Sequence, residues 1–437
     1  MKEKIYNNIV LIYFCIVLLI MLFGGIVLTH TSLDTMVYTN VLFYAAIVGL
    51  FIYLFYKMNM NKFEIKDFFI IGFIIFDFIS LYFAYDRYIA LNGFIGRREG
   101  LLVLMAYYIF FLLASTLNSK SHIKKFICIL SIHCFIQIIY GFLQVLGVEN
   151  FLGIEIQFNY YHYAFCLVGN SNFSSTLMLL ILGIWIGIYM FDDKLFNIKK
   201  IICLEVFLIG LILCGAMSGF VGFVMIILLL IAYIIYLKIF KKKIIFNYLI
   251  KICIIFVLFV WNIVFLSYYA NNQYALDIFD LNTQTTQIAD EGLKDENGTG
   301  RIYIWKIALK NAPRYLLTGI GIDQFMYIND GEYIKDPITG NIVDKAHNEY
   351  LQILLTEGIF KCIIYIIFLL WIFFKSVYSI IKMKKVDGVF FGLFLSFTGY
   401  AVQAFFNISV ARVAPIFFII SGLLLSEIES AKKNIKE

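Results

Sequence analysis

The stretch IICLEVFLIGLILCGAMSGFVGFVMIILLLIAYIIYL, residues 201–237, decides the fold class of this chain. It holds two apolar runs, at about 201–216 and 220–237, and each is close to the length of a helix that crosses a bilayer. Only GAMSG, residues 215–219, separates them, so we expect a tight helical hairpin. Inside a bilayer every backbone polar group must be bonded within the segment, which favours helices over open strands.

Similar apolar runs recur along all 437 residues, of which 62% are hydrophobic and 15% charged. A soluble domain is about half apolar and a quarter charged, so we predict an all-α integral membrane protein with about twelve transmembrane helices. The first run is too long for a signal peptide, and LTHTSLD after it offers no cleavage site, so we expect a retained helix. The expected spans are 8–29, 37–57, 67–84, 100–117, 126–146, 173–191, 201–216, 220–237, 252–270, 355–375, 388–406 and 413–428.

Lysines mark alternate connections between these spans, from Lys2 and Lys4 to Lys432, Lys433 and Lys436. By the positive-inside rule these connections are cytoplasmic, and so are both termini. The net charge of +6 is therefore mostly a matter of topology, and no basic patch indicates nucleic-acid binding. The sequence predicts a multi-pass protein of the cytoplasmic (inner) membrane.

Arginine follows a different rule from lysine. Under this topology all the arginines lie on the outer side, where the positive-inside rule disfavours them. Their planar, permanently charged side chains suit bidentate recognition of phosphate or carboxylate, whereas the alternative is that they anchor helix ends at the interface. The arginines are Arg87, Arg97, Arg98, Arg301, Arg314 and Arg412.

Residues 271–346 form an unusually long outer segment, which is typical of a functional or disordered loop. We expect its polar first part, up to about residue 300, to be mobile. Its second part contains RIYIWKIALKNAP, which predicts an amphipathic helix on the membrane surface that ends at Ala312–Pro313. Ile302, Trp305 and Leu309 form its apolar face, opposite Lys306 and Lys310.

The chain accordingly divides into three parts. We expect the first nine membrane helices in residues 1–270, an extracytoplasmic loop carrying the active-site segment in 271–354, and the last three helices with a cytoplasmic tail in 355–437.

The polar cluster of DKAHNEYLQILLTEG, residues 344–358, lies directly before an apolar run. Asp344 is expected to cap the following helix and to place His347 in its first turn. A helix N-terminus disfavours positive charge, so His347 should be a neutral imidazole that can accept a proton from a sugar hydroxyl. The alternative is a structural histidine that satisfies loop carbonyls.

The other polar residues offer no competing site. His122 falls in a lysine-rich cytoplasmic connection, His133 lies within a span, His30 stands alone, and a sugar-stacking role for His162 would be unspecific. No His, Cys or carboxylate spacing indicates a metal, so we expect a metal-independent protein without cofactors. The eight cysteines fall almost entirely in apolar runs and are interpreted as small core residues.

RIYIWKIALKNAPRYLLTGIGIDQF followed by AHNEYLQILLTEGI resembles the O-antigen ligase and polymerase family of bacterial membrane glycan transferases. GRREG at 96–100 and GNSNF at 169–173 resemble earlier outer-loop signatures of that family. The resemblance covers most of the chain and is densest over about 300–360. The matching positions are Arg301, Trp305, Pro313, Gly319, Gly321, Phe325, His347, Asn348, Tyr350, Leu351 and Gly358.

The resemblance implies transfer of a glycan from an undecaprenyl-diphosphate donor to an acceptor hydroxyl, on a glycan or lipid-glycan, at the outer face of the membrane. His347 would then be the base that activates the hydroxyl, Arg301 a diphosphate clamp, and Arg97 and Arg98 contacts to diphosphate or acceptor. Asn348 and Tyr350 complete the expected substrate-binding set. A base opposite the leaving group favours in-line displacement, which predicts inversion at the anomeric carbon.

One family position departs from this pattern. Many members carry an outer Ser-Arg between two middle helices, where this chain has Ala216-Met217-Ser218-Gly219-Phe220. Arg412 or Arg314 is a candidate to replace the missing arginine.

Two other function classes stay open at this point. A transporter or flippase of lipid-linked glycans would also have about twelve spans, with charged or broken helices at mid-membrane. A non-catalytic assembly partner would leave the arginines and His347 without a role. The sequence does not separate a ligase from a repeat-unit polymerase.

Overall fold

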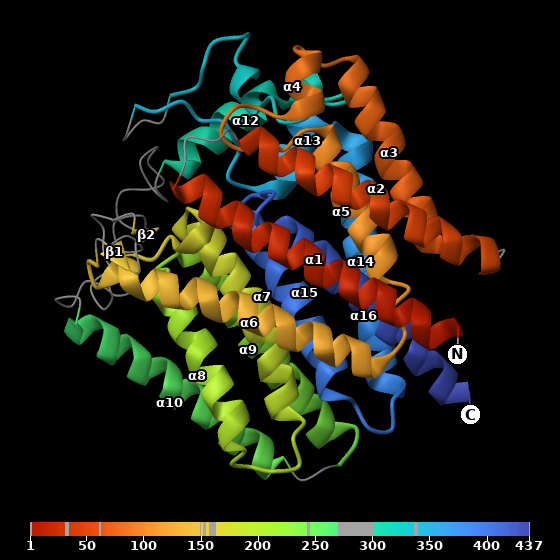
Figure 1. Ribbon diagram of the computed structural model, residues 1–437, viewed down its shortest axis with the longest axis vertical. Coiled ribbons are helices and arrows are strands. Elements are labelled where there is room, and N and C mark those ends of the chain that lie inside the picture. Colours follow the sequence, from red (N-terminus) through yellow and green to blue (C-terminus); the bar gives the residue numbers. More distant parts are fainter. Residues whose placement is uncertain are drawn as a thin grey trace.

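A computed structural model describes residues 2–30, 35–60, 63–148, 150–151, 154–156, 163–242, 245–269, 300–335 and 340–436. These residues are predominantly helical, as predicted, and long apolar helices run from one end of the molecule to the other (Figure 1). The long helices are α1 (Lys2–His30), α2 (Thr35–Met60), α3 (Ile65–Tyr82), α5 (Leu101–Ala114), α6 (Lys120–Val145), α7 (Ser171–Met190), α8 (Ile198–Leu213), α9 (Met217–Ile239), α10 (Phe246–Tyr269), α14 (Ile359–Lys382), α15 (Gly388–Gln403) and α16 (Ala414–Lys436).

Shorter elements fill the connections at one end of this bundle. They are α4 (Arg87–Asn92), η1 (Cys166–Val168), α12 (Arg301–Tyr315), η2 (Phe325–Tyr327), α13 (Glu349–Thr356) and η3 (Ala404–Phe406). One small antiparallel pair, β1 (Asn150–Phe151) with β2 (Ile154–Glu155), was not expected from the sequence. The first part of the long outer segment, residues 271–299, lies outside the described residues.

Nine helices in the described part of the chain are long and apolar enough to cross a membrane. The other three expected spans are also helical, but α5 and α8 have only 14 and 16 residues. The 18-residue helix α3 carries three charged residues, Lys66, Asp67 and Asp77. A multi-pass membrane protein follows from these helices, whereas the figure of twelve spans stays a prediction.

Helices α7, α15 and α16 form the centre of the bundle, because more of their surface is buried than that of the other candidate spans. Their approach is closest at glycines: a Cβ added to Gly187 would lie 2.2 Å from the backbone nitrogen of Gly392. Small residues let membrane helices pack backbone to backbone, where dispersion contacts are densest. The register between α7 and α15 is fixed by this contact.

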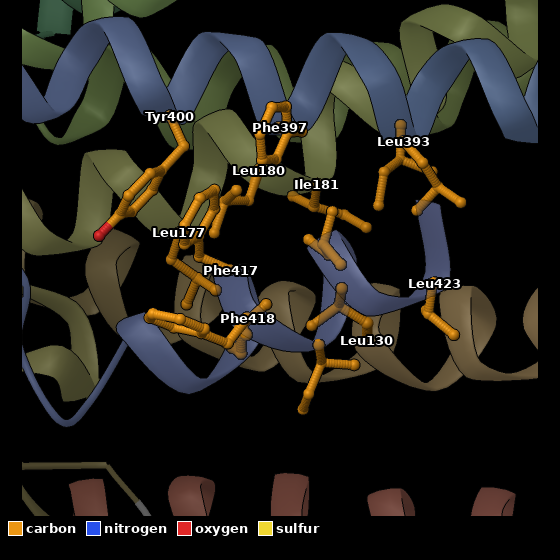
Figure 2. Packing of buried hydrophobic residues seen from close by; sticks show 14 of the residues in the cluster. Leu130, Leu177, Leu180, Ile181, Leu393, Phe397, Tyr400, Phe417, Phe418 and Leu423 are labelled. Atoms are coloured by element: carbon orange, nitrogen blue, oxygen red, sulfur yellow. The ribbon is translucent and has the colours of Figure 1, made fainter. Parts of the chain in front are cut away.

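Aromatic and branched side chains fill the space between the central helices (Figure 2). Tyr400 and Phe417 stack with ring centroids 3.8 Å apart, and Phe397, one turn before Tyr400 on α15, stacks with Phe417 at 5.7 Å. Leu177 and Leu180 of α7 complete the wall in the same view. These side chains join α15 and α16 to α7.

The two ends of the bundle differ in charge. Both termini lie at one end, because Asn7 of α1 bonds Asn118 at 3.2 Å and Ser426 of α16 bonds the Leu117 carbonyl at 2.8 Å. That end carries the lysine-rich connections between α6 and α5, α7 and α8, α9 and α10, and α14 and α15. The connections at the other end carry all the arginines, as the alternation of lysines predicted.

Candidate functional site

Helix α12 begins at Arg301, as predicted, but it does not end at Ala312–Pro313. Pro313 lies inside the helix, which continues to Tyr315. The prediction of the helix end was wrong because a proline in the last turn removes just one backbone hydrogen bond, to the Leu309 carbonyl. The preceding peptide therefore stays helical.

The face of α12 that packs on the protein is also rotated from the predicted one. Ile304 and Ala308 are buried, whereas Leu309 is 62% exposed. Trp305 lies at the edge of this face, and its indole nitrogen donates to the Ala346 carbonyl at 2.9 Å. Arg301, one helical turn before Trp305, is thereby placed beside the loop that carries His347.

His347 precedes α13 and is not in its first turn. The helix begins at Glu349, and its cap is Asn348, whose side-chain oxygen accepts the backbone N–H of Leu351 at 3.0 Å. The prediction that Asp344 caps this helix was wrong, because a closer residue fills the position. His347 is partly buried and has φ of +50°, a left-handed conformation that is rare for side chains with a Cβ.

Asp344 is bound by Arg97 instead. Nε and Nη2 of Arg97 donate to the two carboxylate oxygens of Asp344, and the second bond is 2.9 Å long. The guanidinium also lies over the Phe173 ring, 5.4 Å from its centroid. The neighbouring Arg97 charge holds the pKa of the Asp344 carboxyl below its usual value, against the effect of burial. This pair joins the GRREG loop to the loop of His347.

A second ion pair, which sequence reasoning missed, joins the same two loops. Lys345 is buried, and its ammonium bonds Glu99 at 2.9 Å and Asp323 at 2.7 Å. Burial raises the pKa of the Asp323 carboxyl despite the neighbouring Lys345. The signal available in the sequence was the charge order, since Asp344-Lys345 complements Arg97 and Glu99.

The GRREG loop itself is held by backbone contacts. One carboxylate oxygen of Asp323 accepts the backbone N–H groups of Phe94 at 2.7 Å and of Glu99 at 3.1 Å. Gly93, with φ of +83°, has no room for a side chain against the backbone of Arg98. Arg98 is buried with φ of +53° and donates to the Gly93 carbonyl at 3.3 Å. Arg98 thus supports the loop from within.

Of the four remaining arginines, Arg87 is exposed and donates to the Tyr82 carbonyl at 3.2 Å. Arg314 lies at the far end of α12 from Arg301, about 20 Å along the axis, and pairs with Asp330 on the surface. Arg301 and Arg412 are partly buried, and no carboxylate within the described residues forms an ion pair with either one. Burial lowers the pKa of both guanidinium groups. Burying an unpaired charge is costly, so an anionic partner would be stabilised beside them.

Arg412 lies in a cavity of about 320 Å³ at the arginine-bearing end of the bundle. Arg97 and Asp344 line the same cavity, together with Asn170, which caps the N-terminus of α7. One Arg412 nitrogen donates to the Val168 carbonyl at 2.8 Å and lies against Gly169, where a Cβ would be 2.6 Å away. The structure therefore brings Arg97 and Arg412 together at this cavity, whereas Arg301 and His347 are not among its lining residues.

The position of the missing family arginine is occupied by a polar network. Ser218 bonds the side-chain oxygen of Asn172 at 3.2 Å and accepts from Gln403 at 3.3 Å. Asn407 donates to the Asn172 carbonyl at 3.1 Å, which fixes the connection that leads to Arg412. The connection between α15 and α16, which carries Arg412, is thus linked to this turn through Asn172.

Tyr350, expected to bind substrate, points into the protein. Its hydroxyl donates to the Ala401 carbonyl, and its ring lies 6.2 Å from that of Phe405. Asn348 is engaged as the helix cap. Both residues have defined structural partners, and their role in substrate binding stays a prediction.

A buried polar cluster lies below these loops, between α3, α5 and α14. Lys361 of α14 bonds Asp77 of α3 at 2.5 Å and the Tyr108 hydroxyl at 2.7 Å. Lys361 and Lys345 both line a small cavity of about 50 Å³. Within the described ranges, no group of three or more His, Cys, Asp or Glu side chains is arranged to hold a metal ion.

Residues 201–366 match the model of a protein family described as O-antigen ligase. The match extends from α8 into α14 and contains Arg301, His347, Asn348 and Tyr350. Arg97, Arg98 and Arg412 lie outside it. A search of curated proteins gave no match.

Proposed function

Because residues 201–366 match the O-antigen ligase family model, we propose that this chain belongs to that family and transfers a glycan from undecaprenyl diphosphate to the hydroxyl of an acceptor. The proposed enzyme works at the outer face of the cytoplasmic membrane, with both termini inside. The family assignment supports a membrane-bound ligase or polymerase, and the donor, the face and the mechanism are part of the proposal.

The observation that carries the proposal is which arginines form ion pairs with carboxylates and which do not. Arg97 and Arg314 have carboxylate partners, whereas Arg301 and Arg412 have none among the described residues. A diphosphate would supply the missing negative charge, and the N-terminus of α7 at the same cavity adds a favourable dipole. Arg412 takes the place of the family arginine that this chain lacks.

The chemistry follows from the charges that develop. The acceptor hydroxyl gives its proton to the imidazole of His347, and its oxygen attacks the anomeric carbon of the donor. The bond from that carbon to the diphosphate oxygen breaks, and the electron pair leaves with the diphosphate, which gains one negative charge. Preorganised guanidinium groups stabilise that charge more in the transition state than in the ground state. Attack opposite the leaving group inverts the anomeric carbon.

The position of the site suits a donor with a lipid tail. The cavity lies where α2, α7 and the connection after α15 reach the end of the bundle. A polyprenyl chain can stay in the bilayer while its diphosphate enters at this level, because the helices below have the length of the hydrocarbon layer. Metal ions have no part in the proposed step.

A transfer assay with the purified protein in nanodiscs tests the proposal, using a lipid-diphosphate glycan and candidate acceptors. We expect His347→Ala and Arg301→Ala to lose transfer, and Arg412→Gln to lower it about 100-fold. The matched control is Arg314→Gln, an exposed arginine paired with Asp330, which should stay within about threefold of wild type. Full activity in His347→Ala and Arg301→Ala would overturn the mechanism, and an equal loss in Arg314→Gln and Arg412→Gln would overturn the role of Arg412.

Two further readouts separate the open alternatives. A ladder of repeat units as product indicates a polymerase, and a single addition indicates a ligase. The buried Lys361–Asp77 pair is a reason to test the flippase alternative as well, since charged residues in membrane helices are typical of transporters. Lys361 is only the third residue of α14, however, so the pair lies near the helix end that faces the site. Movement of labelled donor across liposomes without transfer would favour the flippase.

A further inference from the structure

Lys345 joins three segments that are far apart in the sequence. Its ammonium bonds Glu99 of the GRREG loop at 2.9 Å and Asp323 of the GIGIDQF turn at 2.7 Å, and its own backbone belongs to the loop of His347. The side chains of Lys345, Glu99 and Asp323 are at most 4% exposed. The three residues form a buried triad, which we name the Lys345 triad.

The remaining polar atoms of the triad also have partners. The second carboxylate oxygen of Glu99 accepts the Tyr107 hydroxyl at 2.7 Å. The second oxygen of Asp323 accepts the backbone N–H groups of Phe94 and Glu99. A buried ion pair is stable only when such additional hydrogen bonds offset the loss of hydration, and removing one member leaves an uncompensated charge. The geometry of the triad is therefore narrowly defined.

The triad lies immediately before His347. Two peptide units separate Lys345 from His347, which limits their Cα atoms to a separation of about 7 Å. Ala346, between them, is held from both sides, since its N–H donates to the Gln352 side chain at 2.8 Å and its carbonyl accepts from Trp305 at 2.9 Å. His347 then adopts φ of +50°, which a free loop would rarely hold.

We infer that Lys345 is a positioning residue for His347, which fixes the histidine relative to the GRREG loop through Glu99 and Asp323. The inference rests on the proposed function of His347 as the base. A base displaced by about 1 Å loses about 100-fold in rate, so the loss should fall on kcat and not on donor binding.

The competing explanation is that Lys345 only neutralises buried carboxylates. Lys361 is a matched control for this explanation, because its side chain is equally buried at 3% exposure and bonds Asp77 at 2.5 Å. It lines the same cavity of about 50 Å³, but it lies on α14, and its partners in the described part of the chain, Phe73, Asp77, Tyr108 and Glu357, are all outside the His347 loop. Loss of either lysine leaves a buried negative charge, and only loss of Lys345 frees the histidine.

The test compares Lys345→Met and Lys361→Met in the full-length protein in nanodiscs. Per folded molecule, Lys345→Met should lower kcat about 100-fold with the donor KM within about threefold of wild type, whereas Lys361→Met should stay within about threefold in both. If Lys345→Met does not fold, the combined variant Lys345→Met, Glu99→Gln, Asp323→Asn removes the unpaired charges. It should fold and still have kcat lowered at least about tenfold. Wild-type kcat in either Lys345 variant, or equal losses in Lys345→Met and Lys361→Met, would overturn the inference.

Hydrogen exchange supplies a readout that does not depend on transfer. Amides of residues 346–351 should exchange faster than in wild type in the Lys345 variants, and at the wild-type rate in Lys361→Met. If wild type transfers no glycan, or His347→Ala is fully active, the proposed function fails, and the exchange data alone decide whether Lys345 fixes the loop. Unchanged exchange at residues 346–351 in both Lys345 variants contradicts the inference.

Discussion

Arg97 and Asp344 are 247 residues apart in the sequence, and the guanidinium of the first holds both carboxylate oxygens of the second. This bidentate pair lies beside the cavity that contains Arg412, with the two side chains 24% and 18% exposed. The Arg97 guanidinium therefore links two loops, and the Asp344 carboxylate already neutralises part of its charge.

The Arg97–Asp344 pair should show strong coupling. We expect Arg97→Gln and Asp344→Asn each to lower stability, and the double variant to lose less than the sum, with a coupling of about 1–3 kcal/mol. Thermal unfolding in detergent measures the three variants. The exposed Arg314–Asp330 pair is the control, and its coupling should be below about 1 kcal/mol. Equal coupling in the two pairs would show that the Arg97 pair does not fix the loops.

Asn348 should contribute to stability as a helix cap. Replacement by Ala removes the bond to the Leu351 N–H and should cost about 1 kcal/mol, whereas Asp retains an acceptor oxygen and should cost less than half of that. Thermal unfolding of Asn348→Ala and Asn348→Asp gives the comparison. Equal destabilisation by both substitutions would mean that the amide group has a further role, such as the predicted contact with substrate.

The buried carboxyl of Glu349 should make stability depend on pH. Burial raises its pKa from 4.5 to about 7. Hydrogen bonds from the Tyr365 and Tyr400 hydroxyls and the Lys345 charge lower this pKa, and the Glu99 charge raises it. Between about pH 4.5 and 7 the folded protein holds a proton that the unfolded chain has lost. Stability should therefore fall by about 3 kcal/mol as pH rises through this window and level off above it.

Glu349→Gln should remove that dependence. Unfolding temperatures measured from pH 4.5 to 9 should fall less steeply for the variant than for wild type below pH 7. Glu332→Gln, at an exposed carboxylate, is the control and should retain the wild-type slope. A wild-type slope in Glu349→Gln would exclude Glu349 as its source.

Gly319 should tolerate no side chain. It has φ of +72°, and a Cβ there would lie 2.2 Å from the Thr356 carbonyl oxygen. Gly319→Ala should therefore destabilise the protein by about 3 kcal/mol or prevent folding. Gly340 has a similar φ of +71° with nothing within 4 Å, so Gly340→Ala should cost about 1 kcal/mol from backbone strain alone. Comparable losses of stability in the two variants would mean that the Thr356 backbone moves away from the added methyl group at little cost.

The helices were predictable from the sequence because an apolar run of membrane length has few alternatives to a helix. The hairpin at GAMSG is confirmed, with α8 ending at Leu213 and α9 beginning at Met217. The helix that begins at Arg301 is also confirmed, but the prediction of which of its faces is buried was wrong. That face depends on Ile304 and Ala308 meeting Ala346, a contact between distant segments that periodicity within one helix does not contain.

The candidate site was predictable in part for the same reason. His347 and the arginines stood out by residue type and by their place at one end of the bundle. Their partners did not, since pairs such as Arg97–Asp344 and Lys345–Glu99 join residues about 250 positions apart. The predicted cap of α13 was wrong because both Asp344 and Asn348 are good caps, and Asp344 binds Arg97 instead.

The contact between Gly187 and Gly392 has a consequence at the opposite end of their helices. Gly187 is about 25 Å along α7 from Asn170, and α15 leads from Gly392 to the connection that carries Arg412. The two helices are joined again near that end, because Gln403 of α15 donates to the Thr176 hydroxyl of α7 at 2.9 Å and Asn407 donates to the Asn172 carbonyl at 3.1 Å. The spacing between Asn170 and Arg412, and with it the size of anion that the cavity admits, is thus fixed at both ends of α7, by a glycine pair that leaves no room for side chains and by amide hydrogen bonds.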